Sequence, residues 1–525
     1  MKRLLLAALA VAAAAAWTVP STATASEITF SGQYRLRGEY RNNADFTNEN
    51  YSVRAGAGAG APAPNVNNTA NDSTNMWVQR VRLTANAKAT DDTSVKITLQ
   101  DSRTWGVATD NAGGGPQLTD NGTNTVDLHE SYLNVANVFG SPVALRAGRQ
   151  ELAYGDERLI GSFGWNNNGR AFDAFKLMYN SDIVNVDLFT SRINVASSTT
   201  DGTQTESLHG VYATVKAVPN NTIDLYVLNL RNRETAPAAN TFGAATGSNN
   251  GITGGPLGAY YGTQTLYTYG IRLKGDVAGA DYTFELPYQT GTIHRRSSTV
   301  NLTTVPPSFP ATLRNDMQVK SYAYAAKVGY TLTVPVKTRI GVEYDFASGD
   351  KHPVSNATTG AAFNVNDSEI NTFYNLYPTN HDKLGLMDMQ AWRNVKAWNV
   401  NLTVEPSDKL KLFASYWKFA LAAKEDGWYN AGDWNTGAGT GGGVANGVHA
   451  NPVNTAPNNN NYTSDIGSEF DFVATYKYNS ALTIEAGAAH FWAGEFIKNQ
   501  FNAPGAVAND VTGQDWAYLQ LTANF

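Results

Sequence analysis

The sequence predicts an all-β protein, a transmembrane antiparallel up-and-down β-barrel of about 18 strands with both termini in the periplasm. Three observations lead to this fold class. The chain begins with an export signal, polar and apolar residues alternate in segments along its whole length, and its final segment is an alternating strand that ends on an aromatic residue. A barrel in the outer membrane needs this alternation because one face of each strand meets lipid and the other meets a wet lumen.

Residues 1–25 have the features of a secretory signal peptide. A basic pair precedes an apolar run at 4–16, and the small residues Ala23 and Ala25 suit cleavage directly after the second of them. We therefore predict a signal peptide at 1–25 and a single outer-membrane barrel domain at 26–525. The chain has no cysteine, which excludes disulfides, thiolate metal sites and lipoprotein acylation.

Composition excludes other classes of protein. Loss of the two basic residues of the signal leaves 37 Lys and Arg against 45 Asp and Glu, a net charge of about −8 that gives no basis for nucleic-acid binding. Beyond the signal no apolar stretch reaches the roughly 18 residues of a transmembrane helix. The 26 Tyr and 11 Trp are typical of a barrel, which places aromatic girdles at both membrane interfaces.

Strands are predicted wherever the alternation has a period of two. At 76–89, for example, Arg80 and Arg82 alternate with Val81 and Leu83. The same pattern predicts eighteen strands, at 28–41, 76–89, 93–103, 126–136, 142–151, 171–180, 183–193, 207–217, 222–232, 264–275, 279–293, 317–331, 336–347, 393–405, 409–420, 468–478, 481–493 and 514–525.

The connections between these strands alternate in length. Short turns such as 90–92 and 406–408 contain the Asp, Ser, Pro and Asn residues that tight turns need, whereas 42–75 and 348–392 are long. Eight short and nine long connections suit an eighteen-stranded barrel, and a soluble β-sandwich has no reason to sort them in this way. Glycine-rich stretches at 55–64 and 437–443 open no helix, so we interpret them as surface loop rather than phosphate-binding motifs.

The last strand carries an expected assembly signal. Apolar Leu519, Leu521 and Phe525 alternate with polar residues, and Tyr518 precedes them. We predict that these four residues are recognised by the barrel-assembly machinery, and that the apolar face then contacts outer-membrane lipid.

Charged residues fall on the face of each strand that the alternation assigns to the lumen. An arginine or lysine at mid-depth on the lipid face would cost about 2–4 kcal/mol, which favours the lumen assignment. Rings of Arg or Lys select anions. In one interpretation the bases and acids form opposed arcs across a constriction, and in the other they pair within the wall. The predicted pore-lining strand residues are Arg35, Arg37, Arg80, Arg82, Lys96, Glu130, Arg146, Arg272, Arg339, Glu343, Asp345, Glu469, Asp471 and Glu485.

The third long connection, with its flanks at 149–170, adds four charged candidates: Arg149, Asp156, Arg158 and Arg170. A charged, turn-rich loop of this length either folds inward and narrows the pore or forms salt bridges that stiffen the rim. We include its charged residues among those expected to line the pore.

Several blocks of sequence resemble the alginate-export porin family of outer-membrane barrels. They lie at 149–161, 165–174, 344–350, 372–381, 385–388 and 467–471. The resemblance implies an eighteen-stranded barrel whose narrow pore is lined with arginines and acids and passes a polyuronate or another anionic solute.

We therefore expect a porin in the outer membrane of a Gram-negative bacterium, open to passive diffusion of a small polar, anionic or saccharide solute. No cofactor, metal site or catalytic residue is expected, because none of the seven histidines stands in a motif with a nucleophile. The acidic net charge and neutral loops give no support to alginate itself as the solute. A structural barrel that houses a periplasmic electron-transfer or efflux partner is the alternative.

Overall fold

The computed structural model describes residues 27–42, 73–105, 126–195, 205–232, 261–295, 316–351, 369–429, 431, 448–449, 463–501 and 513–525. The predicted signal peptide and the glycine-rich stretches at 55–64 and 437–443 lie outside these ranges, so those predictions stay untested.

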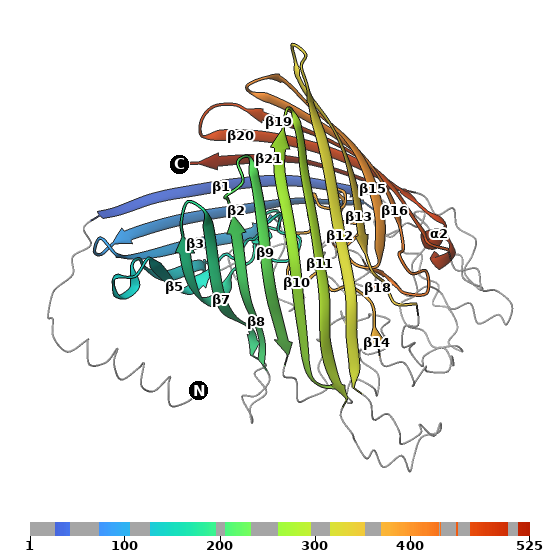
Figure 1. Cartoon of the computed structure of the whole chain (residues 1–525). Coiled ribbons are helices and arrows are strands. Elements are labelled where there is room, and N and C mark those ends of the chain that lie inside the picture. Colours follow the sequence, from blue (N-terminus) through green and yellow to red (C-terminus); the bar gives the residue numbers. More distant parts are fainter. Residues whose placement is uncertain are drawn as a thin grey trace, which may run out of the picture.

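Eighteen long strands form the wall of the molecule (Figure 1). They are β1 (Glu27–Asn42), β2 (Ser73–Lys88), β3 (Thr93–Thr104), β4 (Asp127–Val135), β5 (Val143–Gln150), β6 (Phe172–Asn180), β7 (Val184–Val195), β8 (Thr205–Val215), β9 (Asn221–Asn232), β10 (Tyr261–Val277), β11 (Ala280–Arg295), β12 (Met317–Leu332), β13 (Lys337–Ala347), β15 (Val395–Ser407), β16 (Leu410–Ala420), β19 (Asp465–Lys477), β20 (Leu482–Ala493) and β21 (Gln514–Asn524).

Short elements complete the described part of the chain. They are the 3-10 turn η1 (Val138–Gly140), the helix α2 (Glu495–Phe501) and the two-residue strands β14 (Glu369–Ile370), β17 (Trp428–Tyr429) and β18 (Val448–His449). Within the described ranges, no helix has the length and apolarity needed to cross a membrane.

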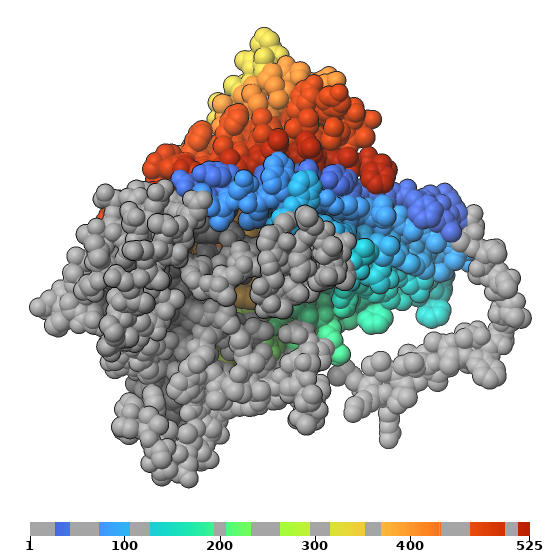
Figure 2. All heavy atoms as spheres, turned by 180° about the vertical axis from the view of Figure 1, so that it is seen from behind, coloured from blue at the N-terminus to red at the C-terminus, as the bar shows by residue number. Residues whose placement is uncertain are grey.

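The sheet closes on itself. Each long strand pairs antiparallel with the next, and β1 pairs with both β2 and β21, so that Tyr34 lies opposite Val81 on one side and Ala523 on the other. Figure 2 shows the consequence, with the first strands in blue beside the last strands in red. The predicted closed antiparallel barrel of 18 strands is confirmed, and the predicted bounds lie within three residues of those observed.

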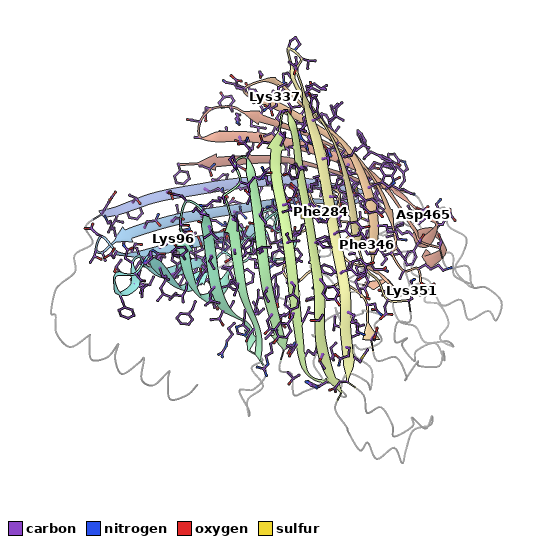
Figure 3. All side chains as sticks on the ribbon, viewed as in Figure 1. Lys96, Phe284, Lys337, Phe346, Lys351 and Asp465 are labelled. Atoms are coloured by element: carbon purple, nitrogen blue, oxygen red, sulfur yellow. The ribbon has the colours of Figure 1, made fainter. Side chains whose placement is uncertain are left out.

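The connections between the strands also alternate between short and long as predicted. All eight short turns lie at one end of the barrel, called here the short-turn end, and the strand ends that lead into the long connections lie at the other, the long-loop end. Figure 3 marks the two ends on one strand, with Lys337 at the start of β13 and Lys351 just beyond its end. The described chain enters the barrel and leaves it at the short-turn end, because β1 begins there and β21 ends there.

The two faces of the wall differ as the alternation predicts. Along β15, the side chains of Trp398, Val400 and Leu402 are exposed on the outside, whereas Ala397 and Asn399, which alternate with them, are buried inside. Burial on the inner face has a specific cause: chain segments from the long-loop end enter the lumen and pack against the wall.

Two such segments matter for the site. Inner loop 1 comprises residues 151–171, between β5 and β6, and inner loop 2 comprises residues 371–394, between β14 and β15. Inner loop 1 bonds to β1 through Arg35 and to β10 through Arg272. These two strands lie nine places apart in a ring of eighteen, so the loop crosses the lumen from one wall to the other.

Candidate pore constriction

Strands β1 and β2 hold inner loop 1 by its backbone. Arg35 donates from Nη1 to the carbonyl oxygen of Gly164 (2.8 Å) and from Nη2 to that of Asn166 (3.0 Å). Arg80, directly opposite Arg35 in the register, donates from Nη1 to the same two oxygens, at 3.1 Å each. Both guanidinium groups are buried, and charged donors make stronger hydrogen bonds than neutral ones. The two arginines therefore act as struts for the loop.

Strand β3 extends this grip. The side chains of Gln100 and Ser102 donate to the carbonyl oxygens of Asn168 (2.7 Å) and Asn167 (2.8 Å). Successive inward-facing side chains on three neighbouring strands thus bond successive carbonyls of residues 164–168. The loop follows the wall here because its carbonyls, removed from water, need donors.

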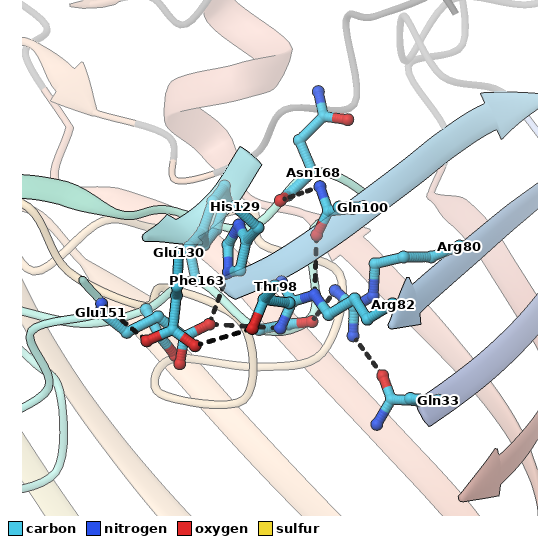
Figure 4. A network of polar contacts seen from close by, with 12 residues as sticks. Gln33, Arg80, Arg82, Thr98, Gln100, His129, Glu130, Glu151, Phe163 and Asn168 are labelled. Carbon is cyan, nitrogen blue, oxygen red and sulfur yellow. Dashed lines mark hydrogen bonds and ion pairs between the residues drawn. The ribbon is translucent and has the colours of Figure 1, made fainter. Parts of the chain in front are cut away.

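A charged network lies beside this contact (Figure 4). Arg82 donates to Gln100 (2.7 Å) and to Glu151 of inner loop 1 (3.2 Å), and His129 Nε2 lies 2.7 Å from the same carboxylate. Lys96 forms an ion pair with Glu130. The exposed side-chain fractions of Arg82, Lys96 and Glu151 are 17%, 28% and 32%, so these groups meet solvent inside the barrel.

The other end of the crossing is anchored by ion pairs. Arg158 is buried between Glu343 and Asp345 of β13, 2.9 Å from the latter. Asp156 lies 2.5 Å from Arg272 of β10, which also contacts Asp224 of β9 at 2.9 Å. Inner loop 1 is thus fixed to two opposite walls by charge.

The charges around these anchors set the pKa values of the two loop groups. Burial disfavours the charged form of both groups, but the opposite charges around them have the larger combined effect. Asp345 and Glu343 raise the pKa of Arg158, and Arg272 holds the pKa of Asp156 below its usual range. Both anchor groups therefore stay ionised at neutral pH, which their electrostatic attachment requires.

Inner loop 2 pairs with inner loop 1 through the backbone. The amide of Tyr377 donates to Leu159 O, and Gly161 donates back to Tyr377 O, both at 2.9 Å. Thr379 adds a backbone bond to Glu157 O (2.9 Å), and its hydroxyl bonds both the Glu157 carboxylate (2.6 Å) and the Phe163 amide (2.8 Å). The two loops therefore form one unit.

Trp165 stands where the two loops meet the β1 wall. Its ring stacks on His381 of inner loop 2, with centroids 3.8 Å apart and planes 8° apart. The guanidinium carbon of Arg37 lies 3.8 Å from the centroid of the Trp165 ring, a cation–π contact. Trp516 and Tyr518 of β21 approach the same ring edge-on.

A sequence profile of the alginate export family matches residues 61–513. The chain belongs to the alginate export family, whose members are outer-membrane channels. No curated protein shows significant similarity to the sequence.

Solved structures similar to this member of the alginate export family include the outer membrane protein OprD and two further proteins, OpdK and OpdO, all of Pseudomonas aeruginosa. OprD is 10% identical over 97% of each chain, with a TM-score of 0.47. OpdK, solved with vanillate, is 9% identical over 94% of this chain and 98% of its own, with a TM-score of 0.49. OpdO is 12% identical over 96% and 98%, with a TM-score of 0.47.

The predicted site residues fall into three groups in this alginate export family member. Most face the lumen and contact inner loop 1 or its neighbours: Arg35, Arg37, Arg80, Arg82, Lys96, Glu130, Asp156, Arg158, Arg170, Arg272, Glu343, Asp345 and, through Tyr518, Glu485. Arg339 pairs with Asp281 near the short-turn end, and Arg146 lies over Tyr132. The third group departs from the prediction.

Arg149 does not line the lumen. It lies opposite Asp173 in the register and pairs with it at 2.8 Å, on the outward face that also carries the exposed Phe175. Alternation from the inward-facing Arg146 places residue 149 on the opposite face, so the prediction that grouped Arg149 with the loop was wrong.

Glu469 and Asp471 face inward but are covered by inner loop 2, with exposed fractions of 0% and 1%. Glu469 accepts a hydrogen bond from the amide of Met387 (2.9 Å), and Asp471 accepts one from Ser415 (2.8 Å). They therefore support the loop rather than meet a solute. The prediction that these two acids line the pore was wrong, because alternation shows the face of a residue and not what covers it.

Sequence reasoning did not single out three residues that hold the two loops together: Glu157, Tyr377 and Thr379. All three lie inside the blocks at 149–161 and 372–381 that resemble the family. Gln289 of β11 also went unnoticed, although it clamps Tyr374 by accepting from its amide (2.9 Å) and donating to its carbonyl (2.6 Å). Nothing in a lone glutamine on an alternating strand signals this role.

Proposed function

We propose that this protein is a passive channel of the Gram-negative outer membrane that admits a small polar solute with a preference for anions. One observation carries the proposal. Inner loop 1 is fixed across the lumen at both walls, and the solvated charged groups Arg82, Lys96 and Glu151 lie beside its attachment to β1–β3. A solute that passes this narrowing must approach them.

The expected selectivity follows from the inward-facing charges of β1–β5. Arg35, Arg37, Arg80, Arg82, Lys96 and Arg146 outnumber the acids Glu39 and Glu130 on the middle of that wall. A low-dielectric wall lined by one sign of charge concentrates counter-ions in front of it. We expect a moderate preference, because Arg82 and Lys96 each have a carboxylate partner.

The apolar outward face and the family support a location in the outer membrane. In this arrangement both termini and the short turns face the periplasm, the long loops face the cell surface, and the barrel-assembly machinery binds the last strand at Tyr518, Leu519, Leu521 and Phe525. No cofactor and no catalytic group enters the proposed function, and the solute is defined only as a small anion or saccharide.

The test is single-channel recording of the refolded mature protein in a planar bilayer with a salt gradient. Stepwise conductance with a reversal potential displaced toward that of the anion supports the proposal. A silent bilayer from a correctly folded barrel contradicts it and favours the alternative of a structural barrel around a periplasmic partner.

A further inference from the structure

The outward face of β7–β9, three strands that lie side by side, changes from one row of residues to the next (Figure 1). Each row consists of residues that lie opposite one another in the register. The row nearest the long-loop end, called here the basic row, comprises Arg192, Ser207 and Arg231. The polar row follows it and comprises Thr190, His209 and Asn229. The apolar row comes next and comprises Leu188, Val211 and Val227.

The two arginines of the basic row are exposed on the outside of the barrel. Among the residues that the structure describes, neither Arg192 nor Arg231 has a hydrogen-bond or ion-pair partner. Asp173 of β6 lies opposite Arg192, but its carboxylate pairs with Arg149 at 2.8 Å. Because neighbouring strands are spaced about 4.8 Å apart, the two arginines flank Ser207 at a separation of about 10 Å. An anion above Ser207 is therefore within reach of both guanidinium groups.

The polar row forms its hydrogen bonds within the wall. Thr190 Oγ1 lies 2.8 Å from His209 Nδ1, and the side-chain amide of Asn229 donates to Leu266 O at 3.1 Å. Tyr267 of β10, opposite Asn229, exposes its ring beside this row. Tyrosines gather where a barrel crosses from hydrocarbon to headgroups. The basic row thus lies on the headgroup side of this boundary, and the apolar row lies on the hydrocarbon side.

Two apolar grooves, of about 400 Å³ and about 510 Å³, lie on the same outward face. The first begins at the polar row and continues between Phe175, Leu177 and Leu188. The second extends toward β10 and β11 and shares Val211 and Val227 with the first. Two adjoining grooves lined by apolar side chains match two acyl chains that lie side by side.

We propose that this face binds one molecule of a phosphorylated, multiply acylated glycolipid of the outer leaflet. Its phosphate lies above Ser207 between Arg192 and Arg231, its sugar covers the polar row, and its acyl chains occupy the two grooves. Guanidinium groups bind phosphate through paired hydrogen bonds, and basic clusters at a membrane surface attract anionic headgroups. The inference rests on the orientation proposed above, which places the long-loop end at the cell surface.

A second copy of the chain fits this face less well. A two-fold contact brings the same patch of both subunits together and therefore requires the patch to complement itself. Here three arginines, Arg149, Arg192 and Arg231, stand against the single carboxylate of Asp173, so that two such patches would repel each other. A lipid phosphate supplies the negative charge that this part of the wall lacks.

The test is native mass spectrometry of the mature barrel refolded in detergent and titrated with lipid A, a phosphorylated and acylated glucosamine disaccharide. We expect saturable binding of one molecule. The double variant Arg192→Gln, Arg231→Gln should bind it about 10-fold or more weakly, because hydrogen bonds from charged donors to the phosphate are lost. The matched control is Lys396→Gln, which removes an exposed outward charge at the same end but on β15. It should change the affinity less than about 2-fold.

Two further probes separate the parts of the lipid. Deacylated lipid A keeps the phosphates but cannot fill the grooves, and it should bind more than about 10-fold more weakly. Phosphatidylglycerol has acyl chains and a phosphate but no sugar for the polar row, and it should bind about 10-fold more weakly. Equal affinity of deacylated lipid A overturns the role of the grooves, and equal affinity of phosphatidylglycerol overturns the choice of a glycolipid.

Wild-type affinity for lipid A in the double variant overturns the site. If that variant does not fold, Arg192→Gln and Arg231→Gln are measured singly, and wild-type affinity in both overturns it equally. Dimers that form without lipid and disappear in the double variant overturn the proposal in favour of a second copy of the chain. A barrel that conducts but binds no lipid A refutes this inference alone, whereas a silent barrel that binds lipid A refutes the channel and leaves the lipid site.

Discussion

The double variant Arg35→Ala, Arg80→Ala should release inner loop 1 from the β1–β2 wall. The change deletes four hydrogen bonds from buried guanidinium groups to the carbonyls of Gly164 and Asn166. Each bond of this kind contributes about 1.5–3 kcal/mol when its partner stays buried. Water that enters the vacated space will satisfy the carbonyls in part, so we expect a smaller net loss of about 2–4 kcal/mol.

That loss corresponds to a shift of about 30-fold to 1,000-fold in the ratio of attached to released loop. Single-channel records should therefore show larger and noisier openings than wild type, while selectivity for anions falls because two inward charges are gone. Hydrogen exchange provides a second measurement, since the amides of residues 162–168 should lose protection. Barrel folding, followed by heat-modifiable migration on gels, should persist because the strand ladder of β1 and β2 is untouched.

Lys274→Gln is the control for removal of inward positive charge without contact with either loop. It should leave the size and noise of the openings at wild-type values. If the double variant conducts like wild type and residues 162–168 stay protected, the arginines are not struts, and the wall–loop contact does not govern the pore.

Three further predictions concern the same unit. Thr379→Val, which removes the hydroxyl between Glu157 and Phe163, should weaken the pairing of the two inner loops by about 1–2 kcal/mol. Increased channel noise in this variant, with the barrel still folded, would show the weakening. Currents as quiet as those of wild type would contradict it. Gly385→Ala should destabilise inner loop 2 by about 1–3 kcal/mol, because Gly385 has φ +86° and a Cβ there would lie 2.5 Å from Glu469 Oε1. The measurement is hydrogen exchange of the Met387 amide, which donates to Glu469. Unchanged protection of this amide would refute the predicted destabilisation. Since the pKa of Asp156 is lowered, its contribution to loop attachment is complete above the unfolded value of about 3.9 and is lost as pH falls through the lower folded value. Channel noise should thus rise below about pH 4 in wild type, and Asp156→Asn should be noisy already at neutral pH; a pH-independent wild type would exclude this anchor.

The sequence was sufficient to predict the strands because the patterns that indicate a strand are local. Alternation along a segment such as 76–89 and turn residues such as those at 406–408 act over a few positions, and the closed ring follows from repeating them. The same alternation placed Arg35, Arg80 and Asp345 on the inner face. The same alternation, applied from Arg146, gives Arg149 the outer face on which it lies, so the prediction of Arg149 as a pore-lining residue departed from the pattern.

The contents of the lumen could not be predicted in this way. Arg35 on an inward face is equally consistent with an anion ligand and with a strut, and only the presence of Gly164 and Asn166 in front of it decides between them. The contact joins residues more than a hundred positions apart in the chain. No periodicity or spacing within either segment indicates that the two segments are in contact.

The two inner loops illustrate why the constriction has to be treated as one object. Residues 157–163 and 377–379 exchange backbone and side-chain bonds, while the first loop is tied to β1, β2 and β10 and the second to β11 and β19. A change in one loop should therefore also affect the strands that only the other loop contacts. On this reasoning Thr379→Val and the Arg35, Arg80 double variant should alter the same openings, although their sites lie on different segments. Independent effects of the two would mean that the loops move separately.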